Sequence, residues 1–110
     1  MFRKYMKRVG FWKSYDEPDL PMPEPEQKLR IPDKRKFYEN LFFIQEQKAS
    51  VDLYKGYSLC RICGERNGSR EYRYRGFIWP EGYIHYIKDH NVRPDEEFRK
   101  MVMEENGHRK

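Results

Sequence analysis

The sequence predicts a small α+β domain, and three observations lead to this fold class. First, 37% of the 110 residues are hydrophobic and 37% are charged, so the chain can bury one small core at most. Second, an alternating tyrosine–arginine run followed by a short aromatic run is typical of a β-hairpin. Third, two closely spaced pairs, one of cysteines and one of histidines, lie on either side of that hairpin.

The two pairs are Cys60-x2-Cys63 and His85-x4-His90, and they contain both cysteines and two of the three histidines. Two thiolates and two imidazoles are ligands that Zn2+ prefers, and four of them complete a tetrahedron. A small core gains stability from such a metal staple. We therefore predict one structural zinc ion. A disulfide or a redox dithiol fits less well, because histidines accompany the cysteines and no βαβ pattern surrounds them.

Residues 54–92 are predicted to form a treble-clef-like zinc module in the order knuckle, β-hairpin and helix. Gly64 closes the knuckle, because glycine tolerates the positive φ that this turn requires. Asn67-Gly68 predicts a turn in the following loop. Tyr72 and Tyr74 then face one side of a strand, Arg75-Gly76 makes the hairpin turn, and residues 77–79 form the returning strand.

The helix of this module is predicted to span residues 80–90. Pro80 suits a first helical position, Glu81 suits the positive end of the helix dipole, and Asn91 is an accepted stop. On an ideal helix, side chains five residues apart point roughly 140° from each other. We therefore expect the last turn to loosen if His85 and His90 are to bind one ion.

Two further helices are predicted to flank the zinc module. Residues 33–53 should contain a helix from Asp33 to Ser50 that packs on the module, with Asp33 as N-cap and an apolar stripe on one face. Residues 93–110 should hold a helix from Pro94 to Asn106, ended by Gly107, and a polar tail. The first stripe consists of Phe37, Leu41 and Ile44, and the second of Phe98, Met101 and Val102.

Residues 1–32 are predicted to form an extended arm that is first basic and then acidic. Residues 1–15 hold five basic residues and no acid, whereas residues 16–26 hold five acids and no base. Four prolines in the acidic block exclude a helix interior or a central strand. The arm either lies along a partner or is a solvated linker, and the sequence leaves both interpretations open.

The stretch CRICGERNGS…GFIWPEGYIHYIKDHNVRPDEEF resembles a family of small, uncharacterised, mainly bacterial and viral proteins. The shared pattern is Cys-x2-Cys-Gly, Asn-Gly, Trp-Pro-Glu-Gly, His-Tyr, a further His and Arg-Pro, and the similarity covers about residues 56–98. Arg75-Gly76 departs from the pattern, which has an acidic residue before the glycine. The resemblance implies a strand-to-helix corner at Trp79–Gly82 and no particular activity. It also implies a metal-ligand set of Cys60, Cys63, His85 and His90.

Three classes of function are compatible with these features. The first is a non-catalytic, zinc-stabilised binding or adaptor protein, a subunit or accessory factor that docks on a larger protein assembly. The second is a nucleic-acid-binding zinc finger, favoured by the net charge of +5 and the pI near 9.2. The residues expected to contact nucleic acid or a partner are basic: Arg3, Lys4, Lys7, Arg8, Arg70, Arg73 and Arg75.

The third class is an HNH-like nuclease, suggested by Asp89-His90-Asn91 after a Cys-x2-Cys pair. It is the weakest of the three, because no further Asn and His follow at the expected spacing. His90 would also have to serve both as metal ligand and as general base. We therefore expect a protein that is not an enzyme and has no small-molecule substrate.

We expect an intracellular protein, cytoplasmic or associated with the nucleoid or nucleus, with no membrane partner. The chain shows no apolar run long enough for an export signal or a membrane span, and reduced cysteines fit an intracellular compartment. The basic start of the chain also keeps the mitochondrial matrix open as an alternative.

Overall fold

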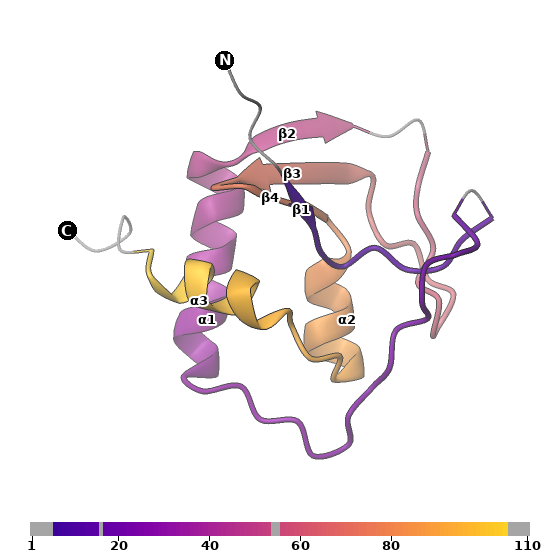
Figure 1. The fold of residues 1–110 in the computed structure, drawn as a ribbon, viewed down its shortest axis with the longest axis horizontal. Helices are drawn as coiled ribbons and strands as arrows, with labels where there is room; N and C mark the ends of the chain where they lie inside the picture. Colours follow the sequence, from indigo (N-terminus) through magenta and orange to yellow (C-terminus); the bar gives the residue numbers. More distant parts are fainter. Residues whose placement is uncertain (1–5, 16, 54–55, 106–110) are drawn as a thin grey trace.

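The structure, a computed structural model, describes residues 6–15, 17–53 and 56–105. Within these residues, four strands form one mixed sheet with the order β1-β4-β3-β2, and three α-helices lie beside it (Figure 1). The domain is therefore α+β, as predicted. The strands are β1 (Lys7–Arg8), β2 (Ser50–Leu53), β3 (Arg70–Tyr74) and β4 (Phe77–Pro80). The helices are α1 (Lys34–Phe43), which continues into the π-helical turn η1 (Ile44–Lys48), α2 (Tyr83–His90) and α3 (Glu96–Met103).

The predicted hairpin is present as β3 and β4. Its two turn residues, Arg75 and Gly76, have φ values of 48° and 83°, which is the conformation that tight hairpin turns require. Tyr72 is opposite Trp79 across the hairpin, and their rings stack with centroids 5.8 Å apart. Both side chains are buried, so the alternation of tyrosine and arginine separates the inner face of β3 from its outer face.

The helices α1 and α3 supply most of the remaining core. Both predicted stripes are buried, and the rings of Trp79 and Phe98 meet at 4.9 Å between centroids. Asn40 ties the two helices together, because its amide donates to the carbonyl oxygens of Val102 and Glu105 at 2.9 and 3.0 Å. The stripe residues are Phe37, Leu41 and Ile44 from α1 and η1, and Phe98, Met101 and Val102 from α3.

Several predicted element ends differ from the structure. Asp33 adopts a left-handed conformation with φ 51° and makes no capping bond with its side chain. The first helix ends at Lys48, and residues 50–53 form β2. The helix α2 begins at Tyr83, because Pro80 still pairs with Glu71 at the end of β4. It does end at the left-handed Asn91, as predicted.

The final helix, α3, is shorter than residues 94–106. Its first turn is capped by Asp95, whose side chain accepts a hydrogen bond from the Phe98 amide. The predicted stop at Gly107 and the polar tail lie outside the described residues. No helix in the described part of the chain combines the length and apolar character needed to cross a bilayer.

The segment between β1 and α1 runs along the domain rather than away from it (Figure 1). Its described residues contain no helix and no multi-residue strand, in keeping with the four prolines. Pro25 forms an isolated bridge with Val92, and Glu26 makes a salt bridge with Arg93 at 2.7 Å. Nearer its start, Arg8 pairs with Glu17 at 2.9 Å. These contacts connect the acidic block to the residues that follow α2 at one end and to β1 at the other.

Candidate metal site

The knuckle at Cys60 is held by its own backbone. The Cys60 amide donates to the Glu65 carbonyl at 2.8 Å, and the Gly64 amide donates to the Cys60 carbonyl at 2.9 Å. Gly64 has a φ of 79°, the left-handed conformation expected from the sequence. The amides of Ile62 and Cys63 point toward the Cys60 Sγ at 3.4 and 3.5 Å. This turn prepares one sulfur for negative charge, which a metal-binding thiolate requires.

An interlocked pair of loops fixes the knuckle relative to α2. A carboxylate oxygen of Glu81 accepts hydrogen bonds from the amides of Ser69 and Arg70 at 3.0 and 3.2 Å. Gly68 leaves the space that this carboxylate fills, since a Cβ there would lie 2.5 Å from it. Glu81 therefore binds the loop before β3, a role that differs from the helix-dipole role expected from the sequence.

Gly82 has the equivalent function on the helix side. A Cβ at Gly82 would lie 2.3 Å from the side chain of Asn67, which is buried. Asn67-Gly68 and Glu81-Gly82 thus fit into each other, and the four residues join the end of the knuckle loop to the beginning of α2. This packing gives a physical reason for the Asn-Gly and Trp-Pro-Glu-Gly strings noted in the sequence.

The four predicted ligand residues come together. One possible ligand atom from each of Cys60, Cys63, His85 and His90 lies within 4.8 Å of all the others. The Cys63 Sγ is 3.5 Å from the His85 Nε2, and the two imidazole rings cross at 87° with centroids 4.8 Å apart. The arrangement is compatible with one metal ion. The helix reaches His90 as a regular α-helix, so the expected loosening of its last turn is not observed.

The histidines are prepared for a cation in different ways. The Nδ1 atom of His85 is 2.9 Å from the carboxylate of Asp89, which leaves Nε2 directed at the cysteine sulfur. Such a carboxylate–histidine pair is the usual support of a metal-bound imidazole. The Nε2 atom of His90 is buried and has no hydrogen-bond partner among the described residues. Because an unsatisfied buried nitrogen is costly, this atom fits a ligand position.

The two thiols differ in their electrostatics. Burial raises the pKa of Cys60, but hydrogen bonds from the amides of Cys63 and Ile62 outweigh burial and lower it. A hydrogen bond from the Glu65 backbone amide lowers the pKa of Cys63. Partial desolvation and the neighbouring Cys60 sulfur raise it by more, so the pKa of Cys63 is raised overall. A negative charge on the Cys60 sulfur therefore disfavours deprotonation of Cys63. A divalent cation between them removes this conflict, because it stabilises both thiolates.

An aromatic shell lies behind the site. Tyr86 is buried with Cys60 and Val92, and Trp12 packs against them with its ring 5.9 Å from that of Tyr86. The Tyr86 hydroxyl accepts a hydrogen bond from the Arg61 amide at 2.7 Å, which fixes the turn next to Cys60. Tyr86 belongs to the His-Tyr element of the sequence pattern, but no sequence pattern indicated that Trp12 belongs to the site. Trp12 is 48 residues away from Cys60 along the chain, so no local signal connects them.

The basic residues expected to contact a partner are mostly engaged within the protein. Lys7 pairs with Asp95 at 3.0 Å, Arg73 with Asp52 at 3.0 Å, and Arg75 with Glu104 at 4.0 Å. Arg8 pairs with Glu17, as described above. The pKa of Arg70 is raised by the Tyr72 hydroxyl and by nearby carboxylates. Arg3 and Lys4 lie outside the described residues.

Comparison with models of known families, with curated proteins and with solved structures finds no match to this chain. The family resemblance noted in the sequence therefore stays a prediction, and the site is interpreted from its own geometry.

Proposed function

We propose that the protein is a non-catalytic binding protein whose zinc module, of treble-clef type, docks on a larger protein assembly. The observation that carries this proposal is the convergence of Cys60, Cys63, His85 and His90. Two thiolates and two imidazoles form a donor set typical of zinc. Four protein ligands fill the tetrahedron and leave no position for a reactive water, which is the pattern of a structural site.

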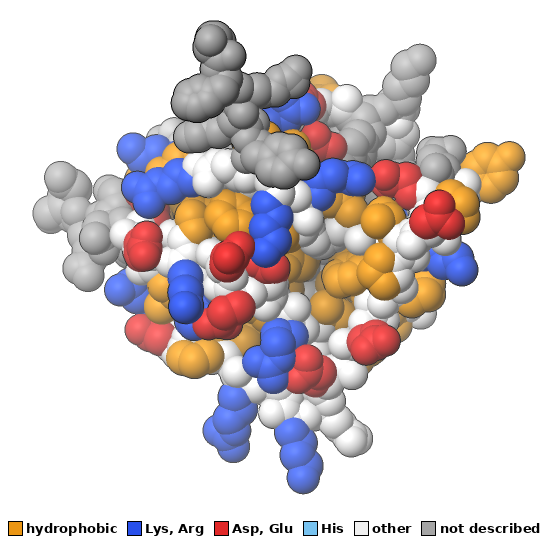
Figure 2. All heavy atoms as spheres, in the orientation of Figure 1, with side chains coloured by type: hydrophobic (Ala, Val, Ile, Leu, Met, Phe, Trp, Pro, Cys, Tyr) orange, Lys and Arg blue, Asp and Glu red, His pale blue; other side chains and the backbone are white. Residues whose placement is uncertain are grey.

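An apolar surface beside the knuckle supports a protein partner. Leu59 and Ile62 flank and occupy the knuckle turn and are 53% and 40% exposed, and Tyr57 is 60% exposed. A groove of about 800 Å³ runs between residues 56–59 and the segment of residues 10–15, and its lining includes the apolar side chains of Phe11 and Trp12. Figure 2 shows hydrophobic side chains gathered on the side of the molecule where these segments lie. Apolar patches of this kind are typical of interaction sites.

Nucleic-acid binding is the second candidate function, but the basic residues expected to carry it are already paired with carboxylates. An arginine that already contacts a carboxylate must give up that contact before it can bind a phosphate. Arg8, Arg73 and Arg75 all have such partners. Nucleic-acid binding by these residues therefore predicts weak affinity and a shallow dependence on salt.

Metal analysis and partner capture test the proposal together. We expect one zinc per chain in protein purified without added metal, and partial loss of secondary structure when a strong chelator removes it. Secondary structure that is unchanged after full removal of the metal would contradict the structural role.

The docking surface is tested with Leu59→Ser in affinity capture from the native source, after nuclease treatment. Leu53→Ser is the matched control, because Leu53 is 71% exposed and lies on β2, outside the groove. We expect the partner to be lost with Leu59→Ser and retained with Leu53→Ser. Equal retention by both variants, or loss of the partner on nuclease treatment alone, would contradict docking through this surface.

A further inference from the structure

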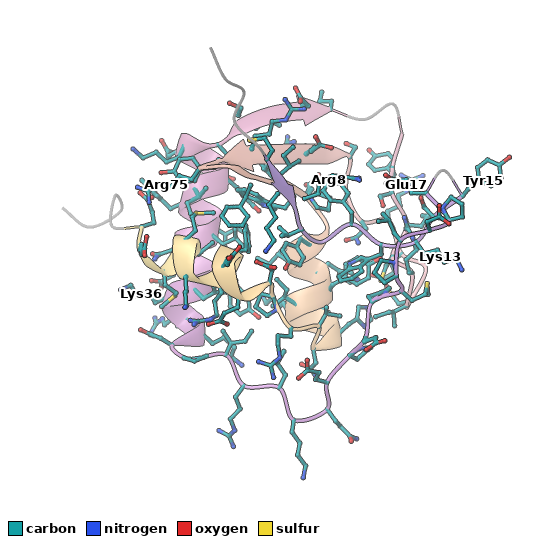
Figure 3. All side chains as sticks on the ribbon, in the orientation of Figure 1. Arg8, Lys13, Tyr15, Glu17, Lys36 and Arg75 are labelled. Carbon is teal, nitrogen blue, oxygen red and sulfur yellow. The ribbon has the colours of Figure 1, made fainter. Side chains whose placement is uncertain are left out.

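A second cavity, with a different chemistry, lies between the loop before α1, the first turns of α1 and the end of α2. Its volume is about 680 Å³, which is within the usual range for small-molecule sites. Lys28 and Arg30 contribute from the loop, Lys34 from the beginning of α1, and Lys88 from α2. No Asp or Glu is among the residues that line it. In Figure 3 the loop forms the lower edge of the molecule, below α1 and α2.

These four basic side chains are free of ion pairs within the described part of the chain. Lys88 lies over the ring of Tyr38, 5.9 Å from its centroid, and this is a cation–π contact rather than a salt bridge. Asp89 is engaged with His85 at 2.9 Å, and its charge, together with the larger effect of burial, raises the pKa of Tyr38. The residues that line the cavity therefore include four basic side chains and no acid.

The walls between the cations are apolar and aromatic. Tyr38, Ile31 and Ile87 line the same cavity, together with the amide side chains of Gln27 and Asn91. A ligand that fits must combine several negative charges with a flat or apolar part. A phosphate group suits the lysines and the arginine, since each donates charge-assisted hydrogen bonds to its oxygens. A base suits the tyrosine and isoleucine walls.

We propose that this cavity binds the phosphate groups of a nucleotide, with the base held against Tyr38. The cavity lies on the side of α2 away from the Cys–His site, and its residues include none of the four metal-ligand candidates. The proposal is therefore independent of the docking function. The same phosphate chemistry occurs in a free nucleotide and at a single strand, and the two sources are separated by experiment.

The test is calorimetric titration of the full-length, zinc-loaded protein with ADP, pyrophosphate, adenosine and an eight-nucleotide single-stranded DNA. We expect ADP to bind, pyrophosphate to compete with it, and adenosine to bind at least tenfold more weakly than ADP. Tighter binding of the single strand than of ADP would identify the phosphates of a strand as the natural source.

Lys34→Gln and its matched control locate the site. Lys36 belongs to the same helix but does not line the cavity (Figure 3), and Lys36→Gln changes the net charge equally. We expect Lys34→Gln to weaken ADP binding about tenfold, the effect of losing one charge-assisted hydrogen bond, and Lys36→Gln to leave it unchanged. No binding of any probe, equal binding of adenosine and ADP, or equal losses in the two variants would overturn the proposal.

Discussion

At the scale of single residues, the chemistry of the candidate metal site depends on which atoms are already engaged. His85 uses Nδ1 for the Asp89 carboxylate, 2.9 Å away, and presents Nε2 to Cys63. Asp89 is one helical turn after His85, so the same helix supplies the imidazole and the group that orients it. A carboxylate in this position fixes the tautomer and increases the basicity of the coordinating nitrogen. Asp89 is therefore placed to orient a candidate metal ligand.

We predict that Asp89→Asn lowers zinc affinity by about 10- to 100-fold while leaving the fold of the zinc-saturated protein intact. The measurement is competition with a chromophoric chelator of known affinity, together with circular dichroism of the saturated protein. Glu104→Gln serves as control, because Glu104 is an exposed acid that pairs with Arg75 at 4.0 Å. Wild-type affinity in Asp89→Asn would show that the pair with His85 does not support metal binding.

At the scale of elements, the connection between the knuckle loop and α2 depends on the lack of a side chain at Gly82. Its backbone is helical, with φ −76° and ψ −3°, so alanine would fit this conformation without strain. The nearest obstacle is the Asn67 side chain, which a Cβ at this position would approach to 2.3 Å. Space, rather than backbone freedom, therefore dictates glycine at this position.

We predict that Gly82→Ala destabilises the zinc-loaded protein by about 1–3 kcal/mol, the usual cost of overpacking. Gly56→Ala is the control, since nothing lies within 4 Å of a Cβ at Gly56, and we expect it to change stability by less than about 1 kcal/mol. Urea denaturation at saturating zinc measures both. A Gly82→Ala variant as stable as Gly56→Ala would mean that Asn67 moves aside at no cost.

The helices and strands also show how much of the fold local sequence patterns can predict. The hairpin at residues 70–80, the buried stripes and the stop at Asn91 were predicted because each depends on neighbours along the chain. β1 and β2 were not, because two- and four-residue strands with exposed side chains carry no periodic signal. Their pairing with β4 and β3 is decided by tertiary contacts.

The four residues of the candidate metal site could be predicted from the sequence, but most of the residues that pack around them could not. Cysteine and histidine are rare in this chain, so the spacing of the four residues was a strong signal. Trp12 and Glu81 were not predicted to support the site, because their contacts join segments that are distant in sequence. The sequence did not predict the basic cavity either, because the segments that line it are distant from one another along the chain. Lys28 and Lys88 are 60 residues apart, and each alone resembles an ordinary surface lysine.

At the scale of the whole molecule, the ion pairs made by the segment before α1 are too exposed to hold it in place. In the pairs Arg8–Glu17 and Glu26–Arg93, every side chain is at least 42% exposed. Pairs of this kind typically contribute at most about 1 kcal/mol each. The segment before α1 is therefore secured mainly by its packing, for instance of Trp12 on Tyr86, which is buried with Cys60 of the candidate metal site.

This dependence predicts a characteristic response to pH and chelation. Metal ligands bind in their deprotonated forms, so acidification makes protons compete with the ion and weakens binding. Without the ion the two thiols act in opposite directions: the lowered pKa of Cys60 adds stability that is lost as the pH falls, whereas the raised pKa of Cys63 costs stability as the pH rises. We therefore expect the zinc-loaded protein to lose stability from pH 8 toward pH 5.

Thermal unfolding of matched zinc-loaded and chelator-treated samples measures this effect. At pH 7.5 we expect the zinc-loaded protein to melt about 10 °C higher or more, which corresponds to a metal concentration about 100 times its dissociation constant. The difference should shrink steadily on acidification, because protons compete with the ion for its ligands. Subtracting one melting temperature from the other removes the part of the surface-carboxylate titration that the two samples have in common. Equal melting temperatures at pH 7.5 would contradict a stabilising metal, and a difference that does not depend on pH would contradict thiolate and imidazole ligands.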